Sequence, residues 1–205
     1  IVTDTTNVIE VGGVFEEITT TVTDVIIIDG VGAQGNSGDI AKNKNGGFID
    51  YNDGSTFATP ISLNSNTWTI IPNDGLGLFT NKNYLPKDVT ELMDTSTGTI
   101  DPTELGLGDY ILIRNDFTVT PSTNNSSLEF RYTLGAGAGA YTLEKRLGRL
   151  DQGSGTPYRF SLGVDEIYMG DINTRDNSIG LEVRLSSPGT LVNAGSAISV
   201  VRYTV

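Results

Sequence analysis

The chain has 205 residues, a net charge of −12 at pH 7, and neither cysteine nor histidine. It therefore cannot form a disulfide, a thiolate zinc site, or a Ser-His-Asp or Cys-His catalytic arrangement, and most transition-metal sites are excluded as well. The acid excess also disfavours nucleic acid and anionic membrane surfaces, so we expect neither as a partner.

Residues 1–30 are predicted to form an extended N-terminal β arm. Thr, Val and Ile recur there in short alternating runs that favour strands over helices. The longest apolar run is Val25, Ile26, Ile27 and Ile28, which suits a strand and is far short of the ~20 residues of a membrane span. Residues 31–60 are rich in Gly, Asn, Asp and Ser, and are predicted to be a linker because they cannot bury enough apolar surface to order alone.

Residues 61–205 are predicted to form an all-β head, an antiparallel jelly-roll sandwich. Short runs of alternating apolar and polar residues, separated by Gly, Asn, Asp and Pro turns, place one side of each strand on a core and the other in water. The candidate strands are 61–65, 67–72, 110–120, 127–134, 141–150, 158–162, 166–169, 179–186 and 197–204. Residues 86–93 are predicted to add one or two helical turns after Pro86.

Three glycine- or acid-rich loops are candidate ligand sites. The run 135–140 lacks the Gly-Lys-Ser/Thr ending of a phosphate loop and precedes a strand, so we interpret it as a hairpin. The loops at 50–54 and 171–176 only faintly resemble calcium loops, because the spacing is short and the bidentate Glu is missing. Turn capping by Asp and Asn is the role predicted for both.

A pair of carboxyl groups, as in glycoside hydrolases, is the enzymatic arrangement that this composition still permits. Neighbouring acids such as Asp165 and Glu166 lie in a predicted strand and are expected to point to opposite faces. Most aromatic rings lie at core positions of strands, which indicates packing. We therefore predict no catalytic residue, no cofactor and no metal site.

The arginines fall mainly on predicted strands, with few lysines nearby. An outward-facing Arg on a strand pairs with acids across strands or across a subunit boundary. Since Arg is enriched and Lys depleted at interfaces, this pattern favours oligomerisation.

The order of features between about residue 60 and residue 205 resembles the jelly-roll heads of the complement and tumour-necrosis-factor type. The resemblance is carried by a predicted core strand at 66–71 with the only Trp, a turn and short strand at 92–100, the Gly108-Asp109-Tyr110 start of a long strand, and an apolar strand at 163–169. It implies a homotrimer. The trimer interface that it implies contains Tyr110, Leu112, Tyr168, Val200 and Tyr203.

The composition, acidic and rich in Thr, Asn, Gly and Ser, also resembles bacteriophage virion proteins. This implies a non-enzymatic capsid decoration, cement or head-fibre protein on the particle surface, assembled in the host cytoplasm. Val25 to Ile28 would then anchor the arm to a major capsid or tail protein by strand addition.

Three alternatives remain open from the sequence. The first is a receptor-binding tail-fibre head that recognises a host surface glycan, and the second is a carbohydrate-active enzyme. The third is a secreted bacterial lectin or surface domain, which would need an export signal, and none is seen in the sequence.

Overall fold

The computed structural model describes residues 7–11, 14–18 and 45–203, and the chain divides into two units, residues 1–39 and 40–205. In the first unit, β1 (Asn7–Val11) and β2 (Val14–Ile18) pair antiparallel as a hairpin. The predicted β arm thus contains a hairpin. Its other part, including Val25 to Ile28, lies outside the described residues.

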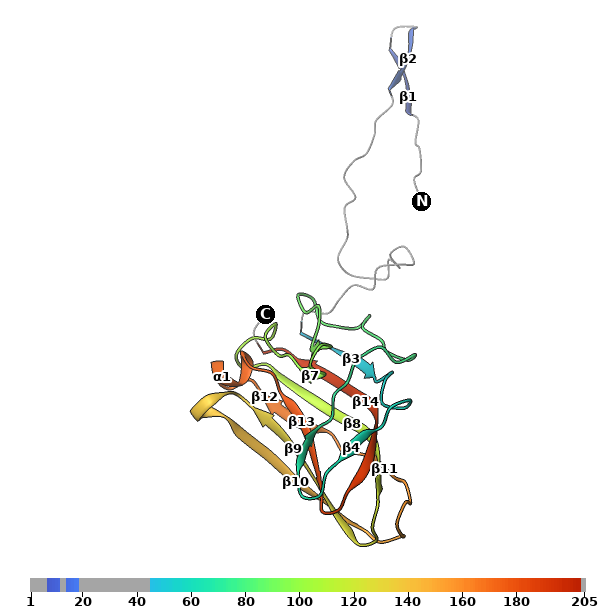
Figure 1. Ribbon diagram of the computed structural model, residues 1–205. Helices are drawn as coiled ribbons and strands as arrows, with labels where there is room; N and C mark the ends of the chain where they lie inside the picture. The colour runs from blue at the N-terminus through green and yellow to red at the C-terminus, as the bar shows by residue number, and fades with distance from the viewer. Residues whose placement is uncertain (1–6, 12–13, 19–44, 204–205) are drawn as a thin grey trace. The chain divides into compact units, whose positions relative to one another are not determined.

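The second unit is an antiparallel β-sandwich of two sheets (Figure 1), as predicted. The larger sheet has the order β11-β8-β14-β3, with β12 also paired to β8 and β4 also paired to β14. Its strands are β3 (Gly46–Asn52), β4 (Ile61–Leu63), β8 (Tyr110–Pro121), β11 (Tyr158–Ser161), β12 (Asp165–Tyr168) and β14 (Gly189–Val201).

The smaller sheet has the order β10-β9-β13-β5. Its strands are β5 (Trp68–Ile70), β9 (Ser126–Leu134), β10 (Tyr141–Leu150) and β13 (Gly180–Leu185). A short pair, β6 (Met93–Asp94) and β7 (Thr99–Ile100), meets the start of β13, where Ile100 bridges Ile179. Among residues 45–203, the helical elements are a 3₁₀ turn, Gly137–Gly139, inside the β9–β10 hairpin and α1 (Ile172–Arg175).

The core lies between the two sheets and follows from the alternation of the strands. On β9 every second residue is buried, from Leu128 through Phe130 and Tyr132 to Leu134, as the sequence pattern predicted. Phe130 lies 6.2 Å from Phe117 of the larger sheet, measured between ring centroids. Each sheet therefore keeps one face for the core and one for the surface.

The prediction of a linker over residues 31–60 is wrong for its last part, because β3 (Gly46–Asn52) pairs with β14. The glycines that suggested a linker allow close backbone approach. A Cβ on Gly47 would lie 2.1 Å from the carbonyl oxygen of Tyr84, and one on Gly46 would lie 2.6 Å from that of Val200. In β3, therefore, glycine is required because neighbouring backbone packs directly against it.

The helical turns predicted for residues 86–93 are not formed. A single turn closes with a bond from the Val89 amide to the Pro86 carbonyl, 3.2 Å long. The next amides, of Thr90 and Glu91, donate to the carboxylate of Glu104. Since these donors have a side-chain partner, they do not continue a helical ladder.

Candidate functional site

Three of the predicted trimer residues lie together on the outward face of the larger sheet. Tyr110 and Leu112 are alternate residues of β8 that point away from the core. On the neighbouring strand β12, Tyr168 lies opposite Tyr110, and Glu166 lies opposite Leu112. Tyr168 is 57% exposed, and its ring packs over Gly170, where a Cβ would come within 2.7 Å of it.

The outward face continues across β14 and β3. Val201 lies beside Tyr110, and Phe48 of β3 lies in the row of Leu112. The ring of Phe48 stacks on that of Tyr84 with centroids 4.8 Å apart, and both side chains are almost half exposed. We call this surface the apolar face. Its members are Phe48, Tyr84, Tyr110, Leu112, Tyr168 and Val201.

The two remaining predicted interface residues are placed differently. Val200 is only 2% exposed and belongs to the core of its own chain, so its assignment to an interface is corrected. The register of β14 puts its neighbour Val201 on the apolar face instead. Tyr203 is 82% exposed, and its amide donates to Asp109 Oδ1 at 2.8 Å, beside the start of β8.

The outward face of the smaller sheet has the opposite character, because charges alternate across its strands. Glu182 of β13 lies opposite Arg131 of β9, and Arg184 lies opposite Glu129. Arg131 Nε donates to Glu182 Oε2 at 2.5 Å, and Arg184 Nε donates to Glu129 Oε2 at 2.7 Å. These arginines pair within the chain, so their position on strands does not by itself indicate an interface.

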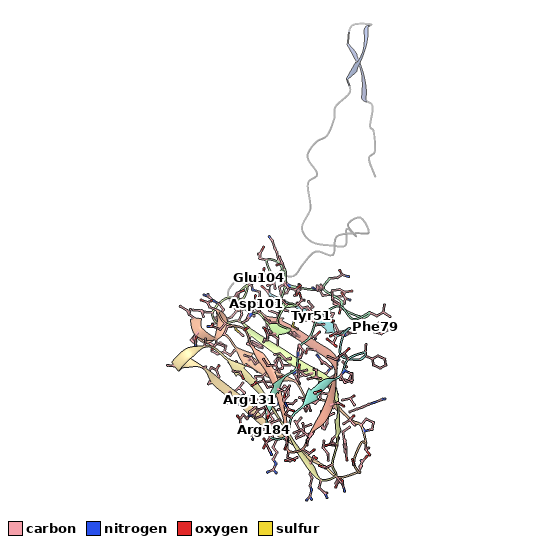
Figure 2. The ribbon with its side chains drawn as sticks, in the orientation of Figure 1. Tyr51, Phe79, Asp101, Glu104, Arg131 and Arg184 are labelled. Carbon is pink, nitrogen blue, oxygen red and sulfur yellow. The ribbon has the colours of Figure 1, made fainter. Side chains whose placement is uncertain are left out.

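Trp68, predicted to lie on a core strand, faces outward on β5. The centres of the Arg131 and Arg184 guanidinium groups lie 4.2 and 4.8 Å from its ring centroid. Figure 2 shows these two arginine side chains along the smaller sheet. The indole is thus held by cation–π contacts on the charged face.

A cleft of about 310 Å³ opens on this charged face. We call it the sheet cleft. Its lining residues are Ile70, Thr99, Arg131, Thr133, Gly135, Ser178, Gly180 and Glu182. A glycosidase needs two carboxyl groups across the scissile bond, whereas this lining contributes one, Glu182, which is paired with Arg131.

Sequence reasoning did not find the sheet cleft. Its residues come from β5, β7, β9, β13 and the segments that flank β9 and β13. Cross-strand register brings them together, and a single sequence does not encode that register in any local motif. The one local signal is Gly180, which stands at an outward-facing position of β13 and leaves the sheet surface without a side chain there.

A buried polar chain joins the two sheets. The Asn115 amide donates to the Tyr132 hydroxyl at 2.7 Å, which donates in turn to Asp165 at 3.1 Å. Asp165 also pairs with Lys145, while Glu166 faces outward, so the prediction of opposite orientations is confirmed. Burial first, and the neighbouring carboxylate second, raise the pKa of Tyr132 and keep its hydroxyl neutral.

The acid-rich loops cap turns, as predicted. Asp53 accepts a bond from the Thr56 amide at 2.7 Å, and Asp171 accepts one from the Thr174 amide at 2.9 Å at the start of α1. These backbone bonds lower the pKa of Asp171. Across the described residues, no three His, Cys, Asp or Glu side chains gather as a metal site. No helix in the same residues has the length and apolarity to cross a membrane.

No protein-family model and no curated protein matches the sequence. Solved structures resemble the chain at TM-scores below one half. Eiger TNF from S. frugiperda gives a TM-score of 0.44 at 12% identity, covering 78% of this chain and 92% of that one. Infectious bursal disease virus Gt strain gives 0.43 at 12% identity, covering 84% of this chain and 36% of that one. The PRD1 vertex protein P5 gives a TM-score of 0.37 at 14% identity, covering 97% of this chain and 82% of that one.

Proposed function

We propose that this chain is a non-enzymatic structural protein of a virus particle, namely a bacteriophage decoration, cement or head-fibre protein that acts as a homotrimer. The observation that carries the proposal is the apolar face on the larger sheet. The three copies would meet through this face, with Tyr110, Leu112 and Tyr168 at the shared seam. In a closed three-fold ring each contact is heterologous, so one part of this face on each copy would meet a different part on the next copy.

The contrast between the two outer faces supports self-association. The smaller sheet carries an ion-pair lattice, which water solvates well, whereas the apolar face holds aromatic and aliphatic groups in two adjacent rows that only Glu166 and Ser199 interrupt. Removing such groups from water stabilises an assembly by roughly 25 cal/mol per Å² of apolar area. Contiguous apolar patches of this kind typically mark interaction surfaces on soluble proteins.

Electrostatics favours this face over other parts of the surface. The chain carries a net charge of −12, so two copies repel each other when carboxylates approach. The six members of the apolar face carry no formal charge. The nearby pair of Arg114 and Asp116, 3.0 Å apart, neutralises itself farther along β8. Glu166, which faces outward opposite Leu112, is the carboxylate that copies meeting here would have to accommodate.

In this proposal, the N-terminal arm attaches the protein to the virus particle. The hairpin of β1 and β2 belongs to a separate unit from the sandwich. A β-rich arm can add its strands to the sheet of a major capsid or tail protein. Val25 to Ile28 are the residues proposed for that anchoring.

Light scattering on the purified full chain tests the trimer. We expect a mass of about 65 kDa, three times the 21.8 kDa of one chain. Tyr168→Glu should shift the mass to that of the monomer, because it places a charge in the apolar seam. Tyr141→Glu is the matched control, since Tyr141 is 43% exposed on the other sheet, and it should leave the trimer intact.

Circular dichroism should show the same β signal for both variants. A monomeric parent chain overturns the trimer. A Tyr168→Glu protein that stays trimeric at micromolar concentration shows instead that copies meet through a different surface.

A further inference from the structure

The sheet cleft exists because residue 180 is glycine. Gly180 lies on the outward face of β13 opposite Thr133. A Cβ built on Gly180 would meet only the Cβ of Thr133, at 4.0 Å, and its backbone does not need a left-handed conformation. The gap is therefore an open space above the backbone, which a side chain could fill without strain.

The polar groups of the cleft are held in place without a ligand. Glu182 Oε2 accepts bonds from Arg131 Nε at 2.5 Å and from Thr133 Oγ1 at 2.8 Å. The Arg131 guanidinium is held in turn by the ring of Trp68. A site whose side chains are already fixed loses little conformational freedom when a ligand binds.

The chemistry of the lining selects the ligand class. The cation of the lining, Arg131, is paired with Glu182 of the lining and with Glu144, 3.6 Å away, so an anionic ligand gains no net attraction. The hydroxyl-bearing residues Thr99, Thr133 and Ser178 line the cleft as well, and Ile70 contributes an apolar side chain that is 47% exposed. Paired donors and acceptors beside an apolar surface match a ring with hydroxyls at its rim and C–H groups on its face.

We propose that the sheet cleft binds a neutral pyranose unit of a surface glycan. Its volume, about 310 Å³, is at the lower end of the range for small-molecule sites, which suits one or two sugar rings. A single ring with so few atoms is expected to bind with a Kd of roughly 1 mM. This site lies on the opposite sheet from the apolar face, so it does not depend on the trimer.

The single Trp provides a reporter. Trp68 contacts Arg131 of the lining, so a ligand that engages the guanidinium should change the indole fluorescence. Methyl glucoside, methyl galactoside and methyl mannoside are titrated into the full chain up to about 100 mM, well above the expected Kd. Free sialic acid serves as the acidic arm. Amide shifts of Gly135 and Gly180 in ¹⁵N spectra give an independent readout at the cleft itself.

Gly180→Leu fills the cleft and should weaken binding at least tenfold. Gly163→Leu makes the same change where no atom lies within 4 Å, in the segment between β11 and β12, and should bind as the parent does.

A saturable response to a neutral pyranoside that Gly180→Leu removes supports the proposal. No response to any sugar overturns it. So does a response to sialic acid alone, or a response that Gly180→Leu leaves unchanged.

Discussion

At the scale of single residues, Tyr51 shows how this chain buries a polar group. Its side chain is fully buried, yet its hydroxyl donates to Glu91 and accepts a bond from the Leu92 amide at 2.8 Å. Lys82 pairs with the same carboxylate and lies 5.4 Å from the Tyr51 ring centroid. Burial opposes ionisation of Glu91, but the bonds from Lys82 and Tyr51 outweigh it and lower the pKa of Glu91.

The same environment makes stability depend on high pH. Burial, followed by the bond to Glu91, raises the pKa of Tyr51 far above its ordinary value of 10.0. A group whose pKa is raised by folding stabilises the protein fully below its unfolded pKa, and that stability is lost as the pH rises beyond it. The free energy of unfolding should therefore fall once the pH passes about 10.

Tyr51→Phe tests this dependence. The variant should lose about 1–2 kcal/mol at pH 7, because Glu91 and the Leu92 amide lose a bonding partner. Above pH 10, the free energy of unfolding should fall less steeply for the variant than for the parent, and the two slopes should differ by about 1.4 kcal/mol per pH unit. Urea unfolding at a series of pH values measures both, and parallel curves for parent and variant above pH 10 would contradict the assignment.

At the scale of elements, β14 is an inner strand of the larger sheet and contains a β-bulge. It pairs with β8 on one side and with β3 and β4 on the other, and its register with β8 shifts between Asn193 and Gly195. Gly195 has a φ of +134°, and a Cβ there would lie 2.2 Å from the Tyr51 carbonyl oxygen. Bulges of this kind tighten the local twist, and here glycine is needed for both the angle and the close approach.

Gly195→Ala should destabilise the protein by about 3 kcal/mol or more, since the added carbon meets backbone that cannot move independently. Gly163→Ala is the matched control, because no atom lies within 4 Å of the added carbon and no left-handed backbone is required. It should change stability by less than about 0.5 kcal/mol. Urea midpoints compare the two, and equal losses would mean that the bulge is not what requires glycine.

At the scale of the whole molecule, the boundary of the head lies earlier than the composition suggested. The sandwich unit includes residues 40–60, and Ile49 and Tyr51 of β3 are fully buried in its core. The two outward surfaces of this unit have different proposed roles. The apolar face is proposed to contact other copies of the chain, and the sheet cleft is proposed to bind a sugar. The residues that define each surface belong to the second unit.

Two truncations should separate these boundaries. Deletion of residues 1–39 keeps the sandwich unit whole, so its thermal unfolding transition and the number of copies measured by light scattering should both stay unchanged. Deletion of residues 1–60 also removes β3 and its two core side chains, so the protein should lose its cooperative transition. If the longer deletion unfolds at the temperature of the parent, β3 does not contribute to the core as described.

The sequence alone determined the all-β class, the strand Tyr141–Leu150, and the buried sides of β9 and β13. These properties are local, because a strand turns alternate side chains to opposite faces whatever its neighbours are. The missing Cys and His removed whole classes of chemistry without any structure. Tyr110, Leu112 and Tyr168 were chosen from the sequence and share one outward surface, although their proposed contact with other copies remains a prediction.

Only the tertiary structure decided what each outward surface is made of. Trp68 lies opposite Arg184, more than a hundred positions later in the chain, and no local pattern encodes that register. The glycines of β3 are compatible with a linker in the sequence, but in the fold the backbones of Val200 and Tyr84 pack against Gly46 and Gly47. Burial follows from the period of a strand, whereas the neighbours that build a face or a cleft follow from long-range pairing, which a single sequence does not reveal.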